Sequence, residues 1–78
     1  MPKKITVYST PTCPYCKMAK AFLDERQAVY QNIDVSADEK AADEMVQKSG
    51  QMGVPVLDID GEIIVGFDQP AITAALGR

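Results

Sequence analysis

Two cysteines are the residues of this chain whose type and spacing could do chemistry. Cys13 and Cys16 are separated by Pro14 and Tyr15, and the chain has no other cysteine and no histidine. A C-x-x-C motif that follows a predicted strand and opens a predicted helix is typical of a redox dithiol. The lack of histidine excludes Ser-His and Cys-His catalysis and histidine-ligated metal sites. The sequence therefore points to thiol chemistry at these two positions.

The position of the motif at a helix start predicts different roles for the two thiols. Pro14 suits the first helical position, which makes Cys13 the expected N-cap. Its sulfur would face the free backbone N–H groups of Tyr15 and Cys16 and the positive end of the helix dipole. These groups favour a thiolate, so we expect Cys13 to be the nucleophile, supported by Pro14 and Lys17. Cys16 lies one turn inside the helix and is expected to be the resolving thiol.

Two other interpretations of the cysteine pair are weaker. A structural disulfide is disfavoured in a cytosolic chain, and so small a loop would add little stability. Half of a zinc or iron–sulfur site would need two further ligands, and the chain offers neither a third cysteine nor a histidine. Only a dimer or an outside thiol could complete such a site, so no metal is expected.

The elements that must position this motif follow from hydrophobic periodicity and turn residues. The second predicted helix begins at a capping box formed by Ser36 and Glu39 and stops at Gly50. The last helix is capped by Asp68 and has Pro70 in its first turn. Strands are predicted over residues 4–8, 29–35, 56–59 and 63–65, and helices over residues 14–27, 36–50 and 68–76.

The order of these elements, β-α-β-α-β-β-α, predicts the fold class. A βαβ unit requires a right-handed crossover and two parallel strands. The Asp60-Gly61 pair is a strong hairpin signal, which makes the last two strands antiparallel. The economical result is an α/β fold of the thioredoxin-like type, a four-stranded mixed sheet with helices on both faces. We expect residues 1–78 to form a single domain of this kind.

Composition restricts the partners and the compartment. The 78 residues carry a net charge of −3 without a basic cluster, which argues against binding to nucleic acid or anionic membranes. No apolar run approaches the roughly 20 residues of a membrane span. The first residues have no signal-peptide pattern. We therefore expect a cytoplasmic protein, and a monomer.

Two blocks of sequence resemble the glutaredoxin family. The first is Thr12-Cys13-Pro14-Tyr15-Cys16 followed by Lys17, and the second runs from Gly53-Val54-Pro55-Val56 through Asp60-Gly61 to Val65-Gly66-Phe67-Asp68. The resemblance covers nearly the whole chain and is closest to short bacterial and archaeal glutaredoxin-like proteins. It implies a dithiol oxidoreductase that reduces protein disulfides or glutathione mixed disulfides, with glutathione as co-substrate and no bound cofactor.

The resemblance also implies roles for four residues outside the cysteine pair. Val54 would offer its backbone N–H and C=O to an extended substrate, as in strand addition. Pro55 would follow a cis peptide bond and lie against the dithiol. Tyr15 would shape the groove beside the cysteines, and Asp68 would bind the α-amino group of glutathione while capping a helix.

Five positions depart from the family pattern. Thr10 and Met52 stand where many members have lysine or arginine, so two cationic partners for glutathione carboxylates are absent. Gly53 replaces the usual threonine or serine, Val65 replaces the first glycine of a pair, and Gln69 replaces a second acidic residue. We therefore expect weakened glutathione-dependent activity.

Two alternative functions remain open. The Gly66-Phe67 pair is similar to redoxins that take electrons from thioredoxin reductase and supply ribonucleotide reductase, although those have a basic residue where this chain has Asp68. The other alternative is an iron–sulfur carrier made of two chains and glutathione. Pro14 argues against it, because cluster-binding members usually have glycine there.

Overall fold

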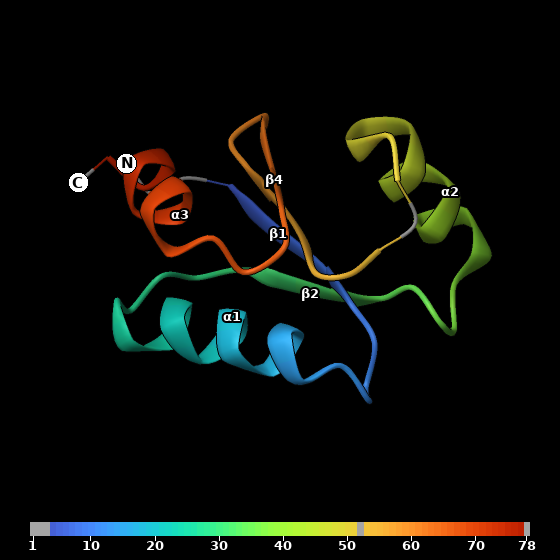
Figure 1. The fold of residues 1–78 in the computed structure, drawn as a ribbon, viewed down its shortest axis with the longest axis horizontal. Coiled ribbons are helices and arrows are strands. Elements are labelled where there is room, and N and C mark those ends of the chain that lie inside the picture. Colours follow the sequence, from blue (N-terminus) through green and yellow to red (C-terminus); the bar gives the residue numbers. More distant parts are fainter. Residues whose placement is uncertain (1–3, 52, 78) are drawn as a thin grey trace.

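The computed structural model describes residues 4–51 and 53–77, which form a four-stranded sheet and three helices (Figure 1). The predicted order of elements is confirmed. The elements along the chain are β1 (Ile5–Ser9), α1 (Pro14–Glu25), β2 (Gln31–Asp34), α2 (Glu39–Ser49), β3 (Val56–Ile59), β4 (Glu62–Val65) and α3 (Gln69–Ala75).

The sheet has the strand order β2-β1-β3-β4. Strand β1 pairs in parallel with β2, where Tyr8 faces Ile33, and antiparallel with β3, where Tyr8 faces Val56. Strands β3 and β4 form the predicted antiparallel hairpin. Its turn residues Asp60 and Gly61 have φ angles of 54° and 95°, a left-handed pair that favours glycine at the second position. The thioredoxin-like α/β fold is thus confirmed.

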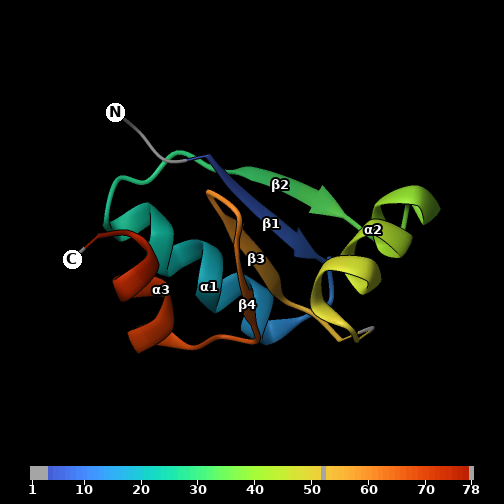
Figure 2. The ribbon, with the colours of Figure 1, turned by 90° about the horizontal axis from the view of Figure 1, so that it is seen from above.

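The two faces of the sheet carry separate apolar clusters. Helices α1 and α3 pack on one face, and α2 packs on the other, at the opposite end of the molecule from α3 (Figure 2). The first cluster is formed by Ile5, Val7, Ala19, Phe22, Leu23, Leu57, Ile59, Ile64, Ile72 and Ala75. The second is smaller and consists of Tyr8, Ala41, Met45 and Val56, with partly buried neighbours. The central strands β1 and β3 contribute to both.

The predicted start of the second helix is wrong. Asp38, rather than Ser36, is the N-cap of α2, and its Oδ1 accepts a hydrogen bond from the Ala41 N–H at 3.1 Å. Ser36 instead donates its N–H to Asp34 at 2.9 Å. A local turn after β2 therefore uses the serine, because a side chain two residues before it already offers an acceptor.

Two other predicted elements are shorter in the structure. Helix α1 ends at Glu25 and not at residue 27, because Gln27 adopts a left-handed φ of 57° and the Ala28 N–H returns to the Leu23 carbonyl. Strand β2 lacks the first predicted residues, and the side chain of Val29 is 80% exposed. Val29 continues the apolar alternation of the strand in the sequence, but it lies in the loop that leads into β2.

Candidate active site

Cys13 is the N-cap of α1, as predicted. Its backbone is extended, with φ −88° and ψ 114°, and Pro14 is the first helical residue. The Cys13 Sγ accepts a hydrogen bond from the Cys16 N–H at 3.1 Å. The expected second donor, the N–H of Tyr15, is not among its hydrogen bonds in the described part of the chain. One backbone donor therefore holds this sulfur at the helix start.

Cys16 is buried beneath Cys13, and both are free thiols. Burial, together with the hydrogen bond and charge of the neighbouring Cys13 sulfur, raises the pKa of Cys16 to about 11. A backbone hydrogen bond from Thr10 and the charge of Lys20 act on the pKa of Cys16 in the opposite direction. Cys13 is half-buried, so an incoming disulfide can reach the Cys13 sulfur but not the Cys16 sulfur. The arrangement provides one accessible sulfur, that of Cys13, and one buried thiol, that of Cys16, which is protonated at neutral pH.

The segment before β3 lies against this pair. The Val54-Pro55 peptide bond is cis, as the resemblance implies, and Pro55 is buried. The Cys13 thiol points at the Val54 carbonyl oxygen, with 3.9 Å between sulfur and oxygen. The Pro55 carbonyl accepts a hydrogen bond from the Gly66 N–H at 2.8 Å, which ties this segment to the loop after β4. The fold thus brings both sequence blocks of the resemblance to one place.

Asp68 caps α3 at the end of that loop. Its Oδ1 accepts a hydrogen bond from the Ala71 N–H at 3.2 Å, and the residue is otherwise exposed. The capping prediction is confirmed. Just before it, Phe67 packs edge-on against Phe22 of α1, with 5.7 Å between ring centroids. This contact connects the loop to the helix that carries the dithiol.

An open hollow of about 450 Å³ lies over the contact between Phe22 and Phe67. Met18 and Gln69 are also among its lining residues. Tyr15 and Met18 are 61% and 47% exposed. The part of α1 that follows Cys13 therefore presents apolar side chains to solvent.

Of the charges on α1, that of Lys20 acts on the buried thiol. Lys20 is half-buried and affects the pKa of Cys16, whereas Lys17 is exposed. Lys17 is expected to support Cys13, which stays a prediction, whereas the effect of Lys20 on Cys16 was not foreseen from the sequence. Its position was readable, because residues four apart on a helix share a face and Lys20 follows Cys16 by one turn. Met52, another residue of the interpretation, lies outside the described residues.

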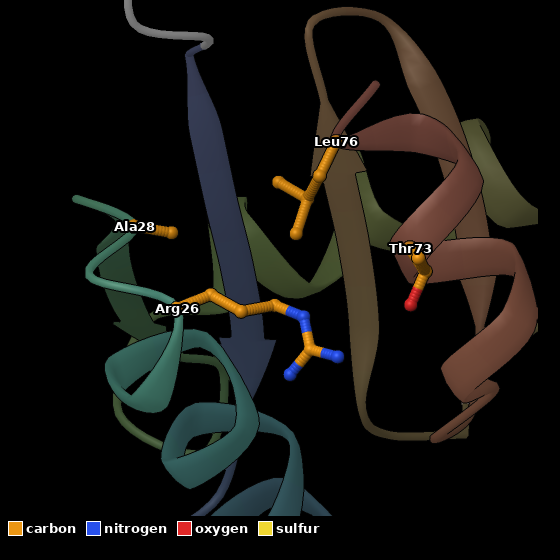
Figure 3. A pocket seen from close by; sticks show the side chains of 4 residues that line it. All are labelled: Arg26, Ala28, Thr73 and Leu76. Atoms are coloured by element: carbon orange, nitrogen blue, oxygen red, sulfur yellow. The ribbon is translucent and has the colours of Figure 1, made fainter. Parts of the chain in front are cut away.

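A second pocket of about 510 Å³ lies between the end of α1 and α3. Figure 3 shows the Arg26 guanidinium reaching from the end of α1 toward α3, where Thr73 and Leu76 line the pocket. The Arg26 guanidinium carbon is 3.7 Å from the centroid of the Phe22 ring. Neither cysteine lines this pocket, so it is separate from the dithiol.

Residues 4–51 and 53–77 contain no group of three or more Cys, Asp or Glu side chains placed to hold a metal ion. Within the same ranges, no helix has the length and apolar character needed to cross a membrane.

Comparison with known proteins agrees with this geometry. The family model for glutaredoxin matches residues 5–64. An uncharacterized glutaredoxin-like 8.6 kDa protein of the rubredoxin operon of Clostridium pasteurianum is 47% identical over 68 residues, covering 87% of this chain and 91% of the relative. Glutaredoxin 3 of Escherichia coli strain K12 is 34% identical over 64 residues, covering 82% and 77%.

Solved structures give the same result. The crystal structure of a thioredoxin-like protein superposes with a TM-score of 0.88 at 33% identity, covering 94% of this chain and 100% of the other. A buckwheat glutaredoxin in complex with glutathione gives a TM-score of 0.78 at 26% identity, covering 95% and 76%. With the family model spanning most of the chain and its C-x-x-C pair at the start of α1, this protein belongs to the glutaredoxin family.

Proposed function

We propose that this glutaredoxin-family redox protein reduces protein disulfides and glutathione mixed disulfides, with Cys13 as the attacking thiolate and Cys16 as the resolving thiol. The observation that carries the proposal is the 3.1 Å hydrogen bond from the Cys16 N–H to the Cys13 sulfur at the start of α1. A backbone donor at a helix N-terminus stabilises negative charge on sulfur. We propose that the protein acts in a reducing compartment such as the cytoplasm, without a bound cofactor.

The reaction would proceed in two exchanges. The Cys13 thiolate attacks a substrate disulfide, forms a mixed disulfide and releases one substrate thiolate. Cys16 then loses its proton and attacks the Cys13 sulfur, which releases the second substrate thiol and leaves a Cys13–Cys16 disulfide. The substrate gains two electrons and the protein dithiol loses two. Two thiols of an outside reductant restore the protein.

Single-cysteine variants test these roles. Cys13→Ser should abolish all disulfide exchange, because the accessible sulfur is removed. Cys16→Ser should keep the first attack and accumulate mixed disulfides, visible as an added substrate mass on the intact protein. A Cys13→Ser variant that still forms mixed disulfides at the wild-type rate would overturn the assignment.

The surroundings of Cys13 support an extended, peptide-like substrate. Val54 is half-buried beside the Cys13 sulfur, and its backbone would pair with the substrate as an added strand. Tyr15 would flank this edge, and Asp68 would take a substrate α-amino group. Glutathione has the required peptide-like shape, and the structure of the buckwheat relative contains it.

The electron donor is the finer part of the proposal. Thr10 and Met52 provide no positive charge for the glutathione carboxylates. A rim ion pair contributes about 1 kcal/mol, so two missing pairs would weaken glutathione about tenfold to thirtyfold. We therefore propose slow turnover with glutathione and equal or better turnover with thioredoxin reductase, which would also allow a role in supplying ribonucleotide reductase.

Two coupled assays separate the donors. NADPH oxidation is followed with glutathione and glutathione reductase in one, and with thioredoxin reductase in the other. Thr10→Lys should raise the glutathione rate several-fold and leave the thioredoxin reductase rate unchanged, with Thr12→Lys as a control for added charge. A flat response to Thr10→Lys would contradict the charge argument.

The iron–sulfur carrier is less well supported. Pro14 occupies the first position of α1, where cluster-binding members of the family usually have glycine. Purification under anaerobic conditions tests this alternative. A brown protein with thiolate-to-iron absorption would favour cluster binding over disulfide exchange.

A further inference from the structure

Lys48 joins the end of α2 to two strands of the sheet. Its Nζ donates hydrogen bonds to the Tyr8 hydroxyl and to Asp58 Oδ2, both at 2.9 Å, and lies 3.4 Å from Glu44 Oε1. The Tyr8 hydroxyl in turn donates to Glu44 Oε1 at 2.8 Å. The hydrogen bonds to Tyr8 and Asp58 raise the pKa of Lys48, which stays charged at neutral pH. We call these four residues the Lys48 network.

The network joins two exposed side chains, Lys48 at 34% and Glu44 at 58%, to two partners that lie deeper in the fold. The Tyr8 side chain is fully buried, and that of Asp58 is only 18% exposed. Asp58 Oδ1 also accepts the Gly61 N–H at 2.9 Å, which fixes the carboxylate in the β3–β4 turn. Lys48 therefore bridges two anchored partners, and their fixed positions hold its long side chain in one geometry.

Both strands of the network lead to the dithiol site. Tyr8 lies in β1, which continues into the loop that ends at Cys13. Asp58 lies in β3, which starts directly after the cis bond at Val54-Pro55. Lys48 is in the last turn of α2, just before the segment that carries Val54. The network thus holds β1 and β3 together. The loop after β1 carries Cys13, and the segment before β3 carries Val54, so both segments that meet at the Cys13 sulfur start from strands in the network.

The helix end itself is well defined. Gly50 caps α2 in a left-handed conformation with φ 76°, and its N–H donates to the Val46 carbonyl at 2.7 Å. The Ser49 hydroxyl lies 2.8 Å from the Met45 carbonyl oxygen, to which it donates, and it accepts the Gln51 N–H at 3.3 Å. Met45 belongs to the second apolar cluster, and Val46 and Val54 pack against it, so a shift of the last turn of α2 would reach Val54 through this packing.

We propose that Lys48 is a positioning residue for the dithiol site: by holding the end of α2 against β1 and β3, it sets the place of the Val54 backbone relative to the Cys13 sulfur. The inference deepens the proposed function, because the Val54 backbone is the edge to which the substrate strand binds. Lys48 does not touch the substrate. It controls how well that edge is pre-organised for binding.

The test compares Lys48→Met with Lys48→Arg and with Lys40→Met, which removes the same charge from an exposed position of α2. Reduced protein is mixed with a short peptide whose cysteine is disulfide-bonded to glutathione, and peptide thiol is measured in a single turnover. Lys48→Met should raise the half-saturating peptide concentration about twofold to tenfold and leave the limiting rate nearly unchanged. Lys48→Arg should restore most of the loss, and Lys40→Met should match the wild type.

Two further measurements separate positioning from a general loss of structure. Alkylation of Cys13 by iodoacetamide needs no substrate edge, so its rate should be unchanged in Lys48→Met. The amide signals of Val54 and Cys13 in ¹⁵N–¹H spectra should move in Lys48→Met and stay in place in Lys40→Met. If Lys48→Met is poorly folded, Asp58→Asn serves as the second variant, with the same expected shifts.

The outcomes decide separately on the positioning role of Lys48 and on the proposed reduction of disulfides. Equal half-saturation and equal spectra for Lys48→Met and Lys40→Met would overturn the positioning role. A loss of limiting rate and folded signal in both Lys48→Met and Asp58→Asn would also overturn it, because that pattern marks a purely structural residue. A wild type that reduces no mixed disulfide would contradict the proposed function, and the spectra would still decide on Lys48.

Discussion

The two thiols of the motif differ in exposure because Cys13 is the N-cap of α1 and Cys16 is buried one turn into the helix. Cys13 is half-buried and accepts a backbone hydrogen bond, whereas Cys16 is fully enclosed. The same three-residue spacing therefore gives one accessible sulfur and one enclosed sulfur. This difference in accessibility comes from the helix start, not from the cysteines themselves.

Alkylation as a function of pH tests this difference. Because burial and the Cys13 sulfur raise the pKa of Cys16 to about 11, iodoacetamide at pH 7 should modify Cys13 alone. Modification of Cys16 should become appreciable only above about pH 10. In Cys13→Ser, burial still keeps the pKa of Cys16 above the ordinary value of about 8.5. Peptide mass mapping after timed quenching measures both sites, and equal labelling at pH 7 would contradict the prediction.

Two variants separate the roles of Asp68. Asp68→Asn keeps a side-chain acceptor for the Ala71 N–H but removes the charge expected to bind an α-amino group. We expect unchanged stability and a raised KM for glutathione. Asp68→Ala should lose the same charge and also about 1 kcal/mol of stability through the missing cap. Urea denaturation and steady-state kinetics on both variants distinguish the effects, and an unchanged KM in Asp68→Asn would exclude amine binding.

Among the secondary-structure elements, the start of α2 gives a direct test of capping. Asp38→Ala should destabilise the protein by about 1 kcal/mol, because the Ala41 N–H loses its acceptor at the helix end. Ser36→Ala should cost less, since Ser36 lies in an exposed turn before the helix. The denaturation midpoints of the two variants give the comparison. A larger loss in Ser36→Ala would restore the capping box that the sequence suggested.

The elements also show how far the sequence alone could lead. Periodicity, Pro14 and the Asp60-Gly61 pair were sufficient for the element order, the N-cap at Cys13 and the hairpin, since these signals are local. The cap of α2 was misassigned because Ser36 and Asp38 are both good capping residues. Choosing between them required knowing that Asp34 already engages Ser36.

Features built from distant segments could not be predicted in this way. The Lys48 network combines a helix and two strands, and its sequence signal is only the pair Glu44 and Lys48, four residues apart on a helix. The approach of Val54 to Cys13 depends on the sheet order. The family resemblance, rather than residue spacing, was what placed the two segments together.

For the molecule as a whole, four groups with raised pKa values give the free energy of unfolding the same direction of pH dependence. Burial raises the pKa values of Cys16, Tyr8 and Tyr30, and hydrogen bonds to Tyr8 and Asp58 raise that of Lys48. Each group holds its proton more tightly in the folded state than in the unfolded state. The contribution of these groups to the free energy of unfolding is therefore present at pH 8. It declines as the pH rises from about 9, the ordinary range of a cysteine thiol, toward the folded-state pKa of Cys16 at about 11.

Urea denaturation under reducing conditions at pH 8, 9.5 and 10.5 measures this decline. The Cys16 contribution, which is lost between about pH 9 and pH 11, should be on the order of 2 kcal/mol. A Cys16→Ala variant should show a flatter profile in that window, although its stability at pH 8 is lower. A wild-type midpoint that stays constant from pH 8 to 10.5 would contradict the assignment.

The outer strands of the sheet have a consequence for the behaviour of concentrated protein. Strands β2 and β4 are the two edges, each is only four residues long, and they carry Asp34 and Glu62 at their ends. Short edges with charged side chains are poor templates for pairing with another chain. Like charges on approaching copies, in a protein of net charge −3, add repulsion. The sheet therefore resists aggregation at β2 and β4, the two edges where a strand of another copy could otherwise pair with it.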